Sequence, residues 1–127
     1  MTALCVAAAA FSLSLPLQAF TLAWQHSIEK VRWEEDYRIT ADGLTLVEAR
    51  IRGSGAGMEP PPDAVLDKGV WRYKPDLPRL PQLRLARSGL VADYQLCWDG
   101  ACRGLGEIVG SEAAAPEVVL SSCSAKP

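Results

Sequence analysis

Alternation of apolar and polar side chains is the feature that most constrains the fold of this chain. It begins at Phe20, continues to Ile28, and resumes over residues 31–39 and 44–51. A period of two is typical of a half-buried strand, because successive side chains of a strand point to opposite faces. The alternation therefore predicts one strand beginning at Phe20 and a hairpin made of the two later segments, with Ala41-Asp42-Gly43 as its turn.

A helix is the alternative for one part of this region. Glu and Lys residues are frequent between Ile28 and Tyr37, and both are good helix formers. The spacing of Val31, Trp33 and Ile39 nevertheless follows the period of a strand.

The second half of the chain consists of short β-prone runs separated by turn signals. Gly69–Lys74 precedes three prolines, which exclude a central strand between residues 75 and 81. Leu90–Trp98 and Ala101–Ile108 are expected to form two further strands. The whole pattern predicts an all-β fold, a small antiparallel sandwich or barrel of roughly seven short strands, with no capped helix.

The length of 127 residues suits a single domain. Met1–Ala19 contains no charged residue and is mostly apolar. It is interpreted as a signal peptide cleaved before Phe20, although it lacks the usual basic residue. A retained N-terminal anchor and a soluble cytosolic chain are the alternatives. We expect one β domain over residues 20–109 and a mobile tail over residues 110–127.

The cysteines support export. Cys97 and Cys102 flank an Asp99-Gly100 pair, the residues that a two-residue hairpin turn prefers. Such a turn would place the two cysteines opposite each other, close enough for a disulfide. Free thiols and a metal pair are the alternatives, the latter without a second ligand pair at zinc spacing. Cys5 falls in the predicted signal peptide, which would leave Cys123 unpaired.

Charge and composition argue against some of the functions that this protein could have. The net charge is −2 and the basic residues are scattered, which argues against a nucleic-acid-binding surface. The sequence carries no cofactor motif. Four tryptophans are many for this length; most should lie in the core, and an exposed one would mark a partner surface.

A glycine-rich segment at residues 53–59 is the most unusual motif. Three glycines alternate with small residues and precede Met58, Glu59 and three prolines. No Lys-Ser/Thr pair and no helix can follow directly, so the segment is neither a phosphate-binding loop nor a dinucleotide fingerprint. The alternatives are a tight corner with close backbone contact and a cradle for a ligand.

His26 is the only histidine, which excludes a site with several histidine ligands. Glu48 and Glu59 are its candidate carboxylate partners. Glu48 lies on the apolar face of Leu44 and Leu46, so it would point inward and need a partner such as His26, Lys30 or Arg50. A structural polar cluster, a ligand site and a catalytic pair are the three interpretations.

Several of these motifs resemble a known family. They are the run from Phe20 to Lys30, Glu34, Glu48-Ala49-Arg50, and the segment Gly53-Ser54-Gly55-Ala56-Gly57-Met58. They resemble a bacterial family of small exported domains of unknown function, over roughly residues 20–108. Its members are often encoded beside TAXI-type tripartite ATP-independent periplasmic (TRAP) transporters. The resemblance implies an association with solute uptake and brings no catalytic residues.

Together these observations predict an exported accessory protein of a TRAP-type transporter, periplasmic or otherwise exported, soluble or N-terminally anchored. Its partner would be the transporter's binding protein or membrane subunits. An organic-acid-binding module is the alternative, and a hydrolase or isomerase using His26 is a third. No cofactor, metal or catalytic residue is expected. The expected ligand or partner surface consists of His26, Ser27, Glu29, Lys30, Glu48, Arg50, Gly53, Gly55, Gly57, Met58 and Glu59.

Overall fold

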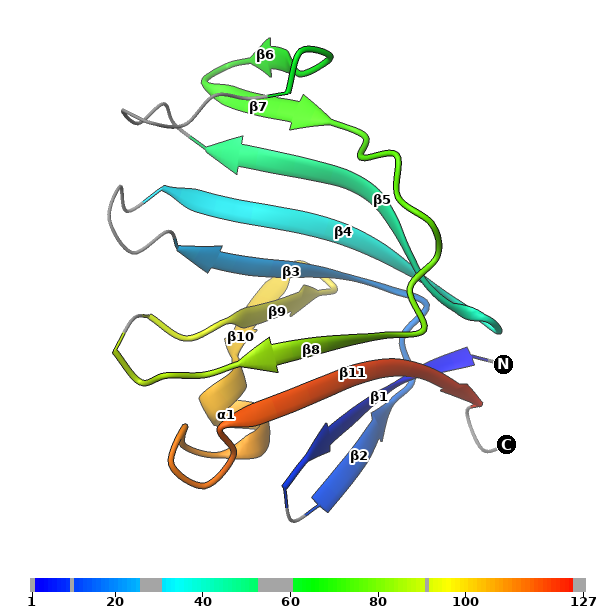
Figure 1. Ribbon diagram of the computed structural model, residues 1–127, viewed down its shortest axis with the longest axis vertical. Coiled ribbons are helices and arrows are strands. Elements are labelled where there is room, and N and C mark those ends of the chain that lie inside the picture. Colours follow the sequence, from blue (N-terminus) through cyan, green and yellow to red (C-terminus); the bar gives the residue numbers. More distant parts are fainter. Residues whose placement is uncertain (1, 10, 26–30, 53–60, 91, 125–127) are drawn as a thin grey trace.

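A computed structural model describes residues 2–9, 11–25, 31–52, 61–90 and 92–124. Two antiparallel sheets face each other as a sandwich and do not close into a barrel (Figure 1). The large sheet has the strand order β10-β9-β3-β4-β5-β7-β6, and the small sheet has the order β2-β1-β11-β8. The all-β prediction is therefore confirmed, and the sandwich is the form that the chain adopts.

The described residues contain eleven strands and one short helix. Among them, no helix is long and apolar enough to cross a membrane. The elements are β1 (Thr2–Ala8), β2 (Phe11–Leu15), β3 (Ala19–Gln25), β4 (Arg32–Thr40), β5 (Gly43–Arg52), β6 (Val65–Asp67), β7 (Val70–Tyr73), β8 (Gln82–Ala86), β9 (Gln95–Trp98), β10 (Ala101–Gly104), α1 (Leu105–Val109) and β11 (Glu117–Ser124).

The large sheet follows the predicted alternation. Phe20 and Leu22 of β3, and Tyr37 and Ile39 of β4, are each at most 4% exposed and face the small sheet. The predicted hairpin of β4 and β5 forms, and the helical alternative for this region is excluded over Arg32–Tyr37. The apolar period of two thus selects the core face of both strands.

Gly43 closes one end of the sandwich. It lies at the β4–β5 turn with a φ of 147°, and a Cβ there would lie 2.4 Å from the carbonyl oxygen of Leu80. This close approach lets Leu44 and Leu80 exchange two backbone hydrogen bonds of 2.8 Å. The Ser122 hydroxyl also donates to the carbonyl of Thr40 and so joins β11 to the large sheet.

The β9–β10 hairpin forms as the sequence predicts. Asp99 and Gly100 both have positive φ, 53° and 78°, as a type I′ turn requires. Cys97 and Cys102 are register partners with a Cα–Cα distance of 4.0 Å and form the predicted disulfide. The second strand is shorter than expected, because the chain turns into α1 at Leu105.

The small sheet is the main difference from the sequence-based prediction. Residues 2–8 and 11–15, assigned to a signal peptide or anchor, form β1 and β2 in this structure, while cleavage before Phe20 stays a prediction. In the predicted mobile tail, Glu117–Ser124 forms β11, which pairs with both β1 and β8. Cys123 was expected to be unpaired, and this prediction is wrong. β1 brings Cys5 next to it, and the two cysteines form a disulfide.

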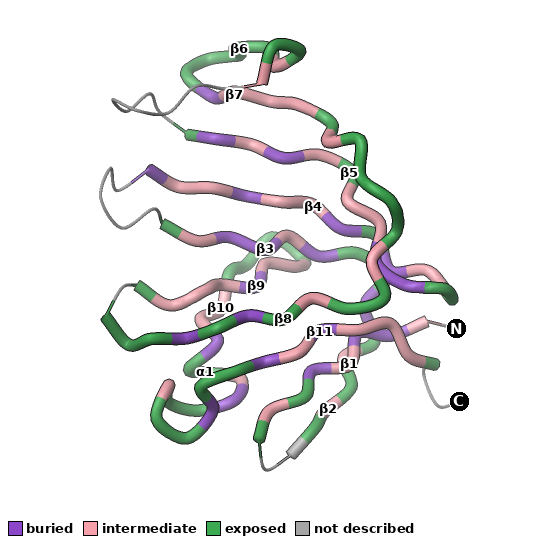
Figure 2. Tube along the Cα trace, viewed as in Figure 1, coloured by how far each residue is buried: buried purple, intermediate pink, exposed green. Residues whose placement is uncertain are grey.

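The core lies between the two sheets. Figure 2 shows buried segments along β3, β4 and β9 of the large sheet and along β1, β8 and β11 of the small sheet. Residues from both ends of the chain therefore complete the core of the central part. The most deeply buried large side chains are Leu4, Val6, Leu44, Leu96, Leu105, Val118 and Leu120.

Candidate functional site

Most of the surface that the sequence predicts lies outside the described residues. This holds for His26, Ser27, Glu29 and Lys30, and for the segment from Gly53 to Glu59, which includes Gly55, Gly57 and Met58. Next to these two segments, the end of β3, the start of β4 and the end of β5 lie side by side at one end of the large sheet. Gln25, Arg32 and Arg52 are register partners there, on three neighbouring strands.

Glu48 does not point inward as predicted. Asp36 pairs with Glu48, but the next residue, Tyr37, pairs with Leu46, so Val47 is an extra residue in β5. This β-bulge shifts the alternation of β5 by one position. Glu48 therefore lies on the outer face, which is the face of the large sheet directed away from the small sheet.

Arg50 is the centre of a cluster of charged residues on this outer face. Its guanidinium donates to three carboxylates. The distances are 3.0 Å to Glu34, 2.6 Å and 2.7 Å to Asp36, and 3.1 Å to Glu48. The outer-face ion network is completed by Arg32 and Arg52, which pair with Glu34, and by Arg72, which pairs with Glu48.

The network shifts the pKa values of its members. Burial alone would raise the pKa of Glu34, but hydrogen bonds from Arg32 and Arg50 and the charge of Arg52 outweigh it, so this pKa lies below its usual value. The pKa of Asp36 is lowered for a similar reason: burial opposes ionisation, and hydrogen bonds from Arg50 and Thr21 overcome it. Arg50 is permanently charged and already saturated with carboxylates, which leaves it unsuited to receive an organic acid.

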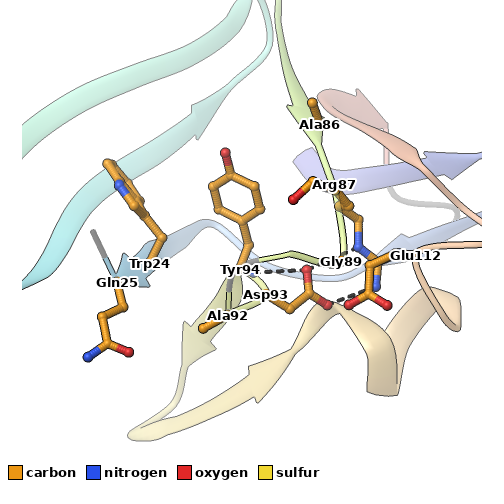
Figure 3. Close-up of a pocket in the computed structure, with 10 residues that line it drawn as sticks. Trp24, Gln25, Ala86, Arg87, Gly89, Ala92, Asp93, Tyr94 and Glu112 are labelled. Carbon is orange, nitrogen blue, oxygen red and sulfur yellow. Dashed lines mark hydrogen bonds and ion pairs between the residues drawn. The ribbon is translucent and has the colours of Figure 1, made fainter. Parts of the chain in front are cut away.

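The described residues form a second feature, a cleft of about 80 Å³ at the end of β3 (Figure 3). Trp24 and Tyr94 supply its aromatic wall, with ring centroids 6.2 Å apart and planes tilted by 59°. Trp24 is held in place from its other side by stacking on Trp33. The other described residues that line it are Gln25, Ala86, Arg87, Ser88, Gly89, Ala92, Asp93 and Glu112.

Arg87 fixes the geometry of this cleft from below its surface. Its side chain is 1% exposed and forms a bidentate ion pair with Asp93, with distances of 3.0 Å and 2.7 Å. It also donates to the carbonyl oxygens of Gly110 and Ala115, both at 2.8 Å. The hydrogen bonds to Asp93 raise the pKa of Arg87, and those to Gly110 and Ala115 hold the Glu112 segment against the turn.

The carboxylate of Asp93 also has all its hydrogen-bond partners within the protein. Besides the ion pair with Arg87, its carboxylate accepts hydrogen bonds from the backbone N–H groups of Tyr94 at 2.9 Å and Gly106 at 3.1 Å. Arg87 and Asp93 are therefore structural and neutralise each other. Glu112, in contrast, forms no hydrogen bond or ion pair with any other described residue.

Sequence reasoning did not find this cleft. Trp24 was assigned to the core face of β3, and Tyr94 to a longer strand over residues 90–98. The Ser88-Gly89 turn was visible, and Gly89 does have the positive φ of 77° that favours glycine. No local signal could show that the segment around Glu112 lies against this turn, because the contact depends on the buried Arg87.

Fold and cleft define a class: a disulfide-bonded antiparallel β-sandwich with a small aromatic cleft at the end of its third strand. Residues 20–105 match the family DUF1850, described as a domain of unknown function, and the chain belongs to this family. No curated protein and no solved structure matches the chain. The family match covers the large sheet and β8, whereas β1, β2 and β11 lie outside it.

Two disulfides suit an oxidising compartment and an exported protein.

Proposed function

We propose that this protein is an exported, periplasmic accessory module of a TRAP-type solute transporter, and that it acts by binding the transporter's binding protein or a membrane subunit. The resemblance of its motifs to a transporter-associated family supports this partner. The two disulfides support the compartment. Contact with a protein, rather than turnover of a metabolite, is the activity that the small cleft at the end of β3 favours.

One observation carries the proposal: an exposed apolar side chain lies beside an aromatic cleft. Leu90 is 90% exposed and directly follows Gly89, which lines the cleft. The rings of Trp24 and Tyr94 form the wall. Protein interfaces are enriched in aromatic anchors, and their projecting apolar residues become buried on binding.

The size of the cleft also favours protein contact. Its volume of about 80 Å³ is well below the roughly 300–1,000 Å³ of a typical small-molecule site. Organic-acid binding, the alternative, gains no support from the buried arginines, because Arg50 and Arg87 already donate to carboxylates. For the hydrolase alternative, Glu48 is engaged by Arg50 and Arg72, and His26 lies outside the described residues.

The test is co-purification from cells that express the transporter. The wild-type chain should recover the binding protein or a membrane subunit, and Leu90→Asp should reduce that recovery at least tenfold. Leu77→Asp is the matched control, because Leu77 is 57% exposed but lies in the crossing segment between β7 and β8. Recovery of neither component by the wild-type chain, together with unchanged solute uptake on deletion, would overturn the proposal.

A further inference from the structure

We infer that the cleft beside β3 receives the ammonium group of a lysine side chain from the partner protein. The identity of the occupant rests on the proposed function. The preference for a cation rests on the cleft alone and is tested separately.

The charge of the lining selects a cation. Among the residues that the structure describes, three charged ones line the cleft, and two of these, Arg87 and Asp93, form a saturated ion pair. The third, Glu112, is half-buried in the wall and has no hydrogen-bond or ion-pair partner among the described residues, although the charge of Arg87 acts on it at longer range. The described lining therefore carries one more negative than positive charge. A carboxylate ligand would be repelled by Glu112 and would find no free donor on Arg87.

The aromatic wall favours the same kind of ligand. Figure 3 shows Trp24 and Glu112 at opposite sides of the cleft, with Tyr94 between them. The face of an indole or phenol ring carries partial negative charge and attracts an ammonium group within about 6 Å of its centre. An ammonium group could therefore contact the rings on one side and the carboxylate on the other.

The volume restricts the ligand to one narrow chain. A cleft of about 80 Å³ has room for the end of a butylammonium chain, which is the side chain of lysine, and not for a whole metabolite. Leu90 at the adjacent turn would at the same time cover the backbone of the partner. The geometry thus fits a lysine that projects from an apolar surface.

The first test uses n-butylammonium as the probe and NMR of the full chain. Titration should shift the Trp24 indole and Gly89 amide signals. Glu112→Gln should weaken the binding about fivefold, as expected for one partly exposed ion pair. Asp76→Asn, which removes the same charge from the distant crossing segment, should leave the binding unchanged. No shift of these signals, equal shifts with n-butanoate, or unchanged binding by Glu112→Gln would each overturn the inference.

The second test addresses the occupant. Recovery of the transporter component should be lost with Glu112→Lys, retained with Asp76→Lys, and reduced by n-butylammonium but not by n-butanoate. Tighter binding of methylguanidinium than of n-butylammonium, or micromolar binding of free 1,4-diaminobutane, would overturn lysine as the occupant. If n-butylammonium binds but no transporter component is recovered, the proposed function and the partner lysine are both wrong, and only the cation preference of the cleft stands.

Discussion

Arg50 and Glu34 lie opposite each other on β5 and β4, joined at 3.0 Å, with side chains only 12% and 9% exposed. Their carboxylate–guanidinium contact is the least exposed ion pair of the outer-face network. Such pairs cost much free energy to desolvate, so the intact network adds little net stability. Removal of one partner, however, would leave an unpaired charge in a partly buried position and would destabilise the fold.

Arg50→Met should therefore lower the free energy of unfolding by about 3 kcal/mol. That value is at the low end for a broken buried pair, because Arg32 and Arg52 still reach Glu34. Chemical denaturation of both chains measures the difference. Arg38→Met, an exposed position of β4 without an ion pair to another described residue, should change stability by no more than about 0.5 kcal/mol. Equal effects of the two substitutions would contradict the role of the network.

Stability should fall in acid. The pKa values of Glu34 and Asp36 are lower in the folded chain than their ordinary values of 4.5 and 3.8. A lowered folded pKa adds stability above the unfolded pKa, and this stability is lost as the pH falls through the folded pKa. The melting temperature should thus decrease from pH 5 downward, and Glu34→Gln should flatten this decrease. An equally steep decrease for Glu34→Gln would argue against this residue as a source of the acid sensitivity.

Gly43→Ala should destabilise the chain by roughly 1–3 kcal/mol, because both the backbone conformation and the contact with Leu80 exclude a Cβ. Thermal unfolding provides the measurement. Gly104→Ala is the matched control: Gly104 has a φ of −67°, and a Cβ there meets nothing within 4 Å. A destabilisation by Gly104→Ala as large as that by Gly43→Ala would disprove the steric argument.

The two disulfides should differ in how much they stabilise the folded chain. Cys5 and Cys123 are 118 residues apart, whereas Cys97 and Cys102 are separated by five. A long closed loop restricts the unfolded chain more, by about 4–5 kcal/mol for a loop on the order of 100 residues. In a chain that retains residues 1–19, the double serine variant of the first pair should lose more stability in urea than that of the second. A larger loss at Cys97 and Cys102 would count against the chain-entropy account.

The strands and turns of the large sheet could be predicted because their signals are local. The period of two in β3 and β4 selects a face, and Asp99-Gly100 selects a turn, without reference to distant residues. The position of Glu48 could not be predicted, because one bulged residue, Val47, reverses the alternation and leaves no compositional mark.

The sequence by itself determined the all-β class, the Cys97–Cys102 hairpin and the family resemblance, since each depends on neighbouring residues. Only the tertiary structure decided that the two chain ends form one sheet, that Cys5 meets Cys123, and that Glu112 lies opposite Trp24. These relationships join residues about 90 to 120 positions apart, and the burial of a shared core, rather than any local preference, brings them together.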